Sequence, residues 1–124
     1  MELVLVGIGG FAGAVARRAV DLWVSDRAQS AFPFGTLVIN LTGSFVLGLL
    51  FAWATERDVL PASIRGPVMI GFIGAYTTFS TWMLESWRLV EEGAWGLAMV
   101  NVFGSVALGL VAVFAGLAVG RSLP

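Results

Sequence analysis

The sequence predicts an all-α integral membrane protein with four transmembrane helices. The chain of 124 residues holds only 7 basic and 8 acidic side chains, or 12% charged residues, about half the share of a soluble domain. Hydrophobic residues make up 58% and the mean hydropathy is +0.91. A membrane-spanning helix needs about 20 mostly apolar residues, and charged residues separate the chain into apolar stretches of this kind. The uncharged stretches are 3–16, 28–55, 66–84 and 93–120.

The four predicted helices follow from these stretches. The first stretch is short, but a helix continued through Arg17, Arg18 and Asp21 is long enough, because arginine side chains near a helix end can extend to the membrane surface. The connections are too short for a soluble domain, so we expect one four-helix transmembrane domain over residues 1–124. The expected spans are 3–24, 34–55, 67–90 and 95–120.

Composition excludes several classes of function. The chain has no cysteine and no histidine, which excludes disulfides, thiol chemistry, the usual zinc sites and histidine acid–base catalysis. A formal net charge of −1 without a basic cluster argues against nucleic acid as a partner. The sequence shows no pair of nucleophile and base, so we expect no enzyme.

The arginines give almost no orientation signal. With four spans, three arginines lie on the side of the N-terminus and four on the other, and there is no lysine. The bias that usually fixes membrane orientation is therefore nearly absent. This balance fits either one weakly set orientation or insertion in both directions, which would permit an antiparallel dimer. The two sets are Arg57, Arg65 and Arg121, and Arg17, Arg18, Arg27 and Arg88.

A single subunit of this size cannot easily enclose a water-filled path. The sequence contains 16 glycines, and small residues recur at the spacing that lets membrane helices approach closely. These pairs fit packing within one subunit as well as between subunits. Together with the small size they favour an oligomer, and a dimer first. The pairs are Gly9 and Gly13, Ser44 and Gly48, and Ser105 and Gly109.

The third segment carries the densest polar group, Gly74-Ala75-Tyr76-Thr77-Thr78-Phe79-Ser80-Thr81-Trp82. Two nearby glycines followed by tyrosine and β-branched threonines make a poor helix interior. We therefore expect a break in this helix at mid-membrane. The backbone carbonyls freed there must be satisfied by protein, an ion or water.

Neutral donors surround the expected break. Asn40 lies near the middle of the second segment, and Asn101 and Ser105 share a face of the fourth. Amides, hydroxyls and the ring edges of aromatic side chains all suit an anion. Each amide or hydroxyl alone is equally a candidate for hydrogen bonds between helices. The only acid deep in this region is Glu85, and the first segment has none before Asp21, which argues against a proton-coupled exporter of cationic drugs.

Three motifs resemble the CrcB/Fluc family of fluoride channels, and the resemblance covers nearly the whole chain. The second and third motifs together are highly specific. The sequence departs from the family at Trp82, where phenylalanine is usual, at Ala75, where glycine is common, and at Asn101, where many members have a smaller hydroxyl residue. The motifs are GGFAGAVARR (9–18), PFGTLVINLTGSFVLG (33–48) and GFIGAYTTFSTW (71–82).

The resemblance implies a dual-topology, antiparallel homodimer with two fluoride pores and a structural sodium ion at the dimer centre. The carbonyls that hold this ion would belong to Gly74 and Thr77, and the charge near a helix end would be Arg17. An indole adds an N–H donor that phenylalanine lacks, so the Trp82 ring can serve the ion differently. The implied pore residues are Asn40, Phe79, Ser80, Thr81, Trp82, Asn101 and Ser105.

The expected function is passive fluoride efflux through the cell inner (plasma) membrane, and hence fluoride resistance. Fluoride is tightly hydrated, so a selective pore must replace its water with closely spaced donors. A membrane potential of about 100 mV contributes about 2.3 kcal/mol per charge toward expulsion of the anion. The alternatives are a small multidrug-type transporter with dual topology and a non-transporting membrane assembly subunit.

Overall fold

The computed structural model describes residues 1–123 and is built from helices, with no β-strand among these residues. The expectation of an all-helical membrane protein is confirmed. Three elements are π-helical turns that continue an adjoining helix. The elements are α1 (Glu2–Ala28), α2 (Phe34–Phe51), a π-helical turn (Ala52–Glu56), α3 (Ala62–Arg65), a π-helical segment (Gly66–Ile73), α4 (Gly74–Tyr76), α5 (Phe79–Glu91), α6 (Trp95–Met99), a π-helical turn (Val100–Gly104) and α7 (Ser105–Ser122).

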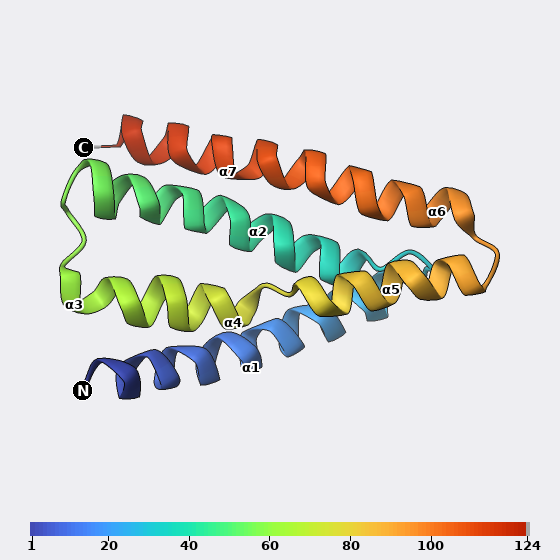
Figure 1. Cartoon of the computed structure of the whole chain (residues 1–124), viewed down its shortest axis with the longest axis horizontal. Coiled ribbons are helices and arrows are strands. Elements are labelled where there is room, and N and C mark those ends of the chain that lie inside the picture. The colour runs from blue at the N-terminus through green and yellow to red at the C-terminus, as the bar shows by residue number, and fades with distance from the viewer. Residues whose placement is uncertain (124) are drawn as a thin grey trace.

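Three continuous helices are long and apolar enough to cross a membrane, namely Glu2–Ala28, Phe34–Glu56 and Trp95–Ser122. The remaining rod runs from α3 through α4 and α5 and is interrupted at Thr77 and Thr78. Figure 1 shows both chain ends beside α3 at one end of the molecule and the turn from α5 to α6 at the other. The chain thus passes back and forth along one axis.

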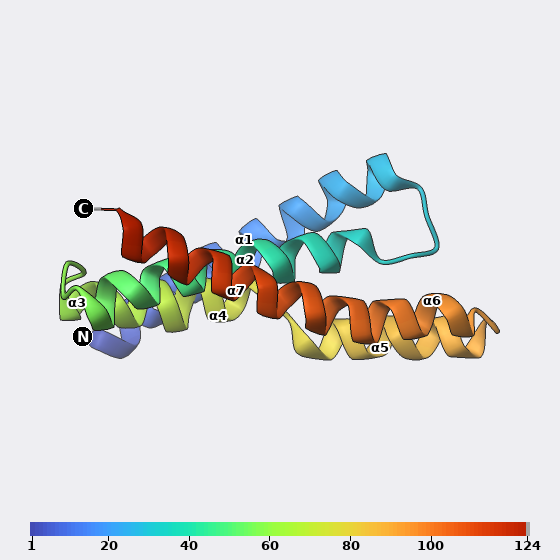
Figure 2. The same ribbon diagram turned by 90° about the horizontal axis from the view of Figure 1, so that it is seen from above.

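Local sequence explains where several helices stop. Gln29 adopts a left-handed conformation with φ 43°, which ends α1. Gly93 has φ 76°, a conformation open to glycine, and lets the chain reverse between α5 and α6. Seen from above, the C-terminal part of α1 and the connection that follows it diverge from α5 and α6 (Figure 2). The polar residues of this connection therefore lie at one end of the molecule.

Glycines allow two pairs of helices to meet backbone to backbone. A Cβ atom on Gly13 of α1 would lie 2.2 Å from the carbonyl oxygen of Phe72, and one on Gly116 of α7 would lie 2.0 Å from that of Phe45. Real Cβ atoms do not approach so closely, so even a methyl group would force these helices apart. Small residues provide close packing where the surrounding lipid offers no hydrophobic driving force between helices.

We expect Gly13→Ala to destabilise the protein by about 1–3 kcal/mol through overpacking against Phe72. The matched control is Gly7→Ala on the same helix, because a Cβ atom on Gly7 meets nothing within 4 Å. Both changes gain the same helix propensity of alanine, so their difference isolates the clash. Unfolding in detergent followed by circular dichroism measures the effect, and equal midpoints for the two variants would refute the proposed close contact.

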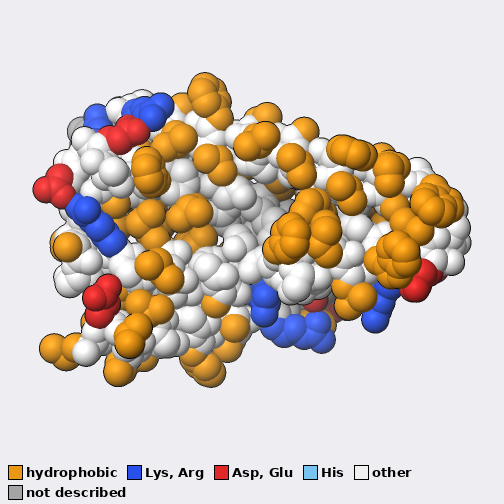
Figure 3. All heavy atoms as spheres, viewed as in Figure 1, with side chains coloured by type: hydrophobic (Ala, Val, Ile, Leu, Met, Phe, Trp, Pro, Cys, Tyr) orange, Lys and Arg blue, Asp and Glu red, His pale blue; other side chains and the backbone are white. Residues whose placement is uncertain are grey.

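Apolar side chains face outward to an unusual degree for a folded protein. In the described part of the chain, the largest fully buried side chains are Ile39 and Asn101. Many large apolar side chains are exposed, and in Figure 3 they cover much of the visible face, with charged groups near the ends and lower edge. This inverted pattern is expected when lipid or another apolar surface surrounds the helices.

Ion pairs join the segments at the end that carries the termini. Arg121 of α7 donates to both carboxylate oxygens of Glu56, at 2.7 and 2.6 Å. Arg57 donates to the carbonyl oxygen of Arg121 at 2.8 Å, and Arg65 pairs with Asp58. Arginine suits such paired contacts because its guanidinium offers several donors in a fixed plane. The bonds of Arg121 with Glu56 and Arg57 tie the end of α7 to the end of the helix Phe34–Glu56.

Candidate functional site: a broken helix beside an uncharged cavity

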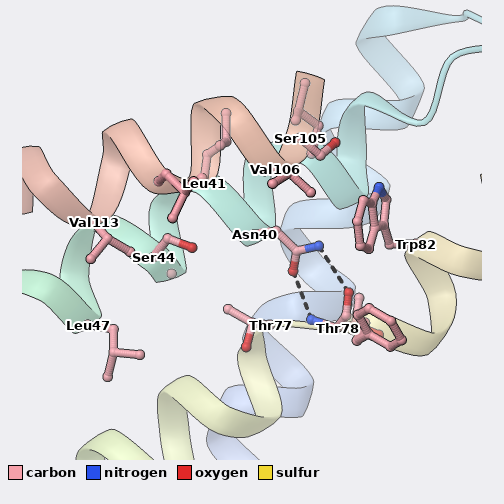
Figure 4. A pocket seen from close by; sticks show the side chains of 15 residues that line it. Asn40, Leu41, Ser44, Leu47, Thr77, Thr78, Trp82, Ser105, Val106 and Val113 are labelled. Carbon is pink, nitrogen blue, oxygen red and sulfur yellow. Dashed lines mark hydrogen bonds between the residues drawn. The ribbon is translucent and has the colours of Figure 1, made fainter. Parts of the chain in front are cut away.

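The side-chain amide of Asn40 holds the break between α4 and α5. Thr77 and Thr78 adopt extended conformations, with ψ 159° and φ −148°, between α4 and α5. The N–H of Thr78 donates to Oδ1 of Asn40 at 2.8 Å, and Nδ2 of Asn40 donates to the carbonyl oxygen of Thr78 at 3.0 Å (Figure 4). Asn40 therefore satisfies both backbone groups of a residue that lies outside any helix.

This arrangement turns the helical donors of two carbonyls at the break toward other acceptors. In a continuous helix the N–H of Thr78 would donate to Gly74, and the N–H of Thr81 would donate to Thr77. In the structure the first donates to Asn40, and the second donates to the Thr78 hydroxyl at 3.4 Å. The carbonyl oxygens of Gly74 and Thr77 thus lie beside the break with capacity to accept, which is the chemistry that a hard cation requires.

Hydroxyl groups fasten α4 to its surroundings. The Thr77 hydroxyl donates to the Ile73 carbonyl at 3.0 Å, and the Thr42 hydroxyl donates to the Val38 carbonyl at 2.7 Å. Because the Thr42 proton is used in this bond, the Tyr76 hydroxyl at 2.9 Å donates to Thr42. The break is therefore fixed to α2 on both sides of Thr77.

A cavity of about 410 Å³ opens beside the break. It lies between α2, the break with the first turn of α5, and α7, and Figure 4 shows the side chains around it. Leucine and valine side chains make up much of the wall. Of the fifteen described residues that line it, none is charged, and the polar ones offer an amide or hydroxyl group. The polar lining residues are Asn40, Ser44, Thr77, Thr78 and Ser105.

Two aromatic rings form one side of the cavity. The rings of Phe79 and Trp82 meet edge to face, with centroids 5.6 Å apart and planes at 69°. The Trp82 indole N–H donates to the backbone carbonyl of Asn101 at 3.1 Å. From the sequence, this N–H was expected to be available as a donor to an ion. In the structure it is used between helices, because the π-helical turn after α6 brings that carbonyl within reach.

The structure brings five of the predicted site residues to one cavity, namely Asn40, Thr77, Phe79, Trp82 and Ser105. The other five lie outside its lining. Gly74 is exposed at the start of α4, and Ser80 and Thr81 are exposed in the first turn of α5. Asn101 is 1% exposed and donates to Ser86, and Arg17 is half-buried on α1.

Sequence reasoning missed two polar pairs that involve α5. The Thr36 hydroxyl donates to Glu85 at 2.9 Å, and the Asn101 amide donates to the Ser86 hydroxyl at 2.9 Å. Glu85 also borders a second cavity of about 440 Å³, below the connection between α1 and α2. The spacing of four residues between Trp82 and Ser86 places both on one helical face and is the sequence signal for this pair.

Comparison with known proteins identifies relatives over the full length of this chain. The Fluoride-specific ion channel FluC of Magnetococcus marinus is 45% identical over 121 residues, which cover 98% of both chains. The protein of the same name from Hahella chejuensis is 44% identical over 120 residues, covering 97% of this chain and 94% of the relative. Fluoride-specific ion channel FluC 1 of Symbiobacterium thermophilum is 43% identical, covering 97% and 98%.

A family model agrees with these relatives. The model of the family described as "CrcB-like protein, Camphor Resistance (CrcB)" matches residues 4–117, which include the break at Thr77 and Thr78 and most of every long helix. Together with the full-length relatives, this match shows that the chain belongs to the CrcB family.

Proposed function

We propose that this protein is a fluoride-selective ion channel through which fluoride leaves the cytoplasm passively. The observation that carries the proposal is the set of relatives named fluoride-specific ion channels, which match this chain end to end at 43% to 45% identity. The uncharged cavity beside the broken helix, which presents amide and hydroxyl groups in a largely apolar wall, supports the same function. The pathway would cross the inner (plasma) membrane and confer fluoride resistance.

The cavity offers the donors that a small, tightly hydrated anion needs. A side-chain amide carries two hydrogens, and Asn40 uses one on Thr78, so the other can face the ion. The hydroxyls of Ser44 and Ser105 and the ring edges of Phe79 and Trp82 line the same space. A conducting site must bind strongly enough to replace water and weakly enough to release the ion. Neutral donors meet both demands.

We infer that the working unit is an antiparallel homodimer. Phe79 is 71% exposed at the cavity in one subunit, a position that a second subunit would cover. The nearly even division of arginines between the two ends permits insertion in both directions. Each subunit would bring one broken helix to the interface, and the dimer would hold two fluoride pores.

A structural sodium ion fits the two broken helices of such a dimer. The carbonyls of Gly74 and Thr77, whose helical donors are directed elsewhere, would hold it. The ion would supply positive charge that offsets the partial negative charge of carbonyls taken out of water. The bonds of Asn40 to Thr78 and of Thr42 to Tyr76 would hold these carbonyl oxygens in place for the ion.

The two rival functions have less support. A multidrug-type transporter needs a carboxylate deep in the first helix, but Asp21 lies near the C-terminal end of α1 and pairs there with Arg18 at 3.1 Å. A non-transporting assembly subunit would not need a cavity with amide and hydroxyl groups beside a broken helix. A growth assay in cells that lack their own fluoride export distinguishes these functions. Expression of this protein should restore their growth in fluoride, and growth no better than with an empty vector would contradict the proposed role.

The Trp82 ring gives a further test of the pathway. We expect Trp82→Ala to lower the rate of fluoride efflux from liposomes, because the variant loses the ring that lines the cavity while the fold keeps its other contacts. Trp82→Phe should keep the preference for fluoride over chloride, since it keeps an aromatic ring edge at the same place. An alanine variant that folds and conducts at the wild-type rate would place Trp82 outside the pathway.

A further inference from the structure

A closed set of three hydrogen bonds lies behind the Trp82 ring. The indole N–H of Trp82 donates to the Asn101 carbonyl at 3.1 Å, and the Asn101 amide donates to the Ser86 hydroxyl at 2.9 Å. The Ser86 hydroxyl in turn donates to the Trp82 carbonyl at 2.8 Å. The bonds therefore run from the ring of Trp82 to its own backbone through two other residues.

These supporting side chains are buried away from the cavity. Asn101 is 1% exposed and Ser86 is 6% exposed, and neither lines the cavity that Trp82 borders. Ser105 adds a longer bond to the Asn101 oxygen at 3.4 Å. In Figure 4 the nitrogen of Trp82 lies at the end of the ring farthest from Thr78. The indole nitrogen and its hydrogen-bonding partners thus lie on the side of Trp82 that faces away from the cavity.

A π-helical turn makes this geometry possible. The turn Val100–Gly104 lies within the long helix Trp95–Ser122 and includes Asn101. The Asn101 carbonyl accepts from the Ser105 N–H as well as from the indole N–H of Trp82. A carbonyl oxygen has two lone pairs and can accept both. Such single π-helical turns often occur at functional sites. Here the turn directs one backbone oxygen and one amide of Asn101 toward α5.

An indole needs such a tether more than a phenyl ring does. It is larger and unsymmetrical, so a rotation about the side-chain bonds would carry its N–H and its bulk into the cavity. We infer that Asn101 and Ser86 are positioning residues that hold the Trp82 ring against the cavity wall, and that Asn101 does not contact the ion. The inference rests on the proposed fluoride pathway and identifies what keeps it open at Trp82.

Fluoride efflux from liposomes tests this role. Asn101→Ala and Ser86→Ala should each lower the initial rate about fivefold, the size expected from the loss of one hydrogen bond. The control is Ser122→Ala, which removes a similar serine-to-carbonyl bond of 2.9 Å at the exposed end of α7. Its rate should stay within about twofold of wild type. A rate for Ser86→Ala equal to that of Ser122→Ala would overturn the inference.

A second background separates positioning from contact with the ion. When Trp82→Phe is already present, no indole remains to be held, so adding Asn101→Ala or Ser86→Ala should change the rate less than about twofold. If Asn101→Ala lowers the rate equally in both backgrounds, Asn101 acts on the ion directly and the inference fails. Should Asn101→Ala not fold, the two Ser86→Ala variants make the same comparison.

A spectroscopic measurement keeps the test independent of transport. The chain has five tryptophans, and Trp82→Phe identifies the Trp82 indole N–H resonance in ¹⁵N-labelled protein by its disappearance. Ser86→Ala should shift this resonance and speed its exchange with water, and an unchanged resonance would contradict the tether. If the wild-type protein conducts no fluoride, the proposed function fails, whereas this measurement still decides whether Ser86 and Asn101 hold the ring.

Discussion

Asn40→Asp is expected to abolish fluoride efflux. The amide of Asn40 both donates to and accepts from the backbone of Thr78. An ionised carboxylate can still accept but has no hydrogen to donate, so the Thr78 carbonyl loses its partner and the cavity loses an anion donor. The new negative charge would also repel fluoride where a low dielectric strengthens the interaction. Efflux from liposomes should fall to the level of protein-free vesicles.

Asn40→Ala separates the two effects of this change. It removes both bonds to Thr78 without adding charge, so the broken helix is less well held and efflux falls, but no repulsion is introduced. Size-exclusion chromatography and circular dichroism must show that both variants assemble and remain helical. A correctly assembled Asn40→Asp protein that conducts near the wild-type rate would remove Asn40 from the fluoride pathway.

Removal of sodium is expected to abolish efflux as well. In the proposed dimer, the carbonyls of Gly74 and Thr77 from the two subunits would lack a partner without a cation, which is costly away from water. Purification and assay in N-methylglucamine salts should therefore give protein that conducts no fluoride and dissociates more readily. Adding sodium back should restore the rate.

Two controls accompany this prediction. Chemical crosslinking follows the subunit association directly, so a loss of dimer is distinguished from a closed pore. Ser122→Ala, with its change at the far end of α7, should show the same sodium dependence as the wild type. Undiminished efflux after thorough removal of sodium would contradict a structural role for the ion.

Much of the architecture was predictable because it depends on composition. Long uncharged stretches require helices in lipid, and the all-helical membrane character is confirmed. The run from Gly74 to Trp82 predicted an interruption because β-branched and aromatic residues follow closely spaced glycines. The extended residues are Thr77 and Thr78. The position of the break depends on Asn40 of α2, and the helix propensities of the residues around the break carry no information about that contact.

The partners of the polar side chains were less predictable. The sequence offers Asn101 and the Trp82 indole as possible donors to an ion, but the structure joins both to groups of the protein. These partners lie on α5 and on the π-helical turn after α6, two segments that only the tertiary fold brings together. Conversely, the face shared by Trp82 and Ser86 follows from their spacing alone, so this part of the network was accessible from the sequence.

Efflux from liposomes shows directly whether this chain alone conducts fluoride selectively. Purified protein is placed in vesicles loaded with fluoride or chloride, with an ionophore to balance charge, and ion-selective electrodes follow both anions. We expect rapid fluoride release and chloride release no faster than from protein-free vesicles. Fluoride release at the protein-free rate, or equal release of both anions, would contradict selective conduction by this chain.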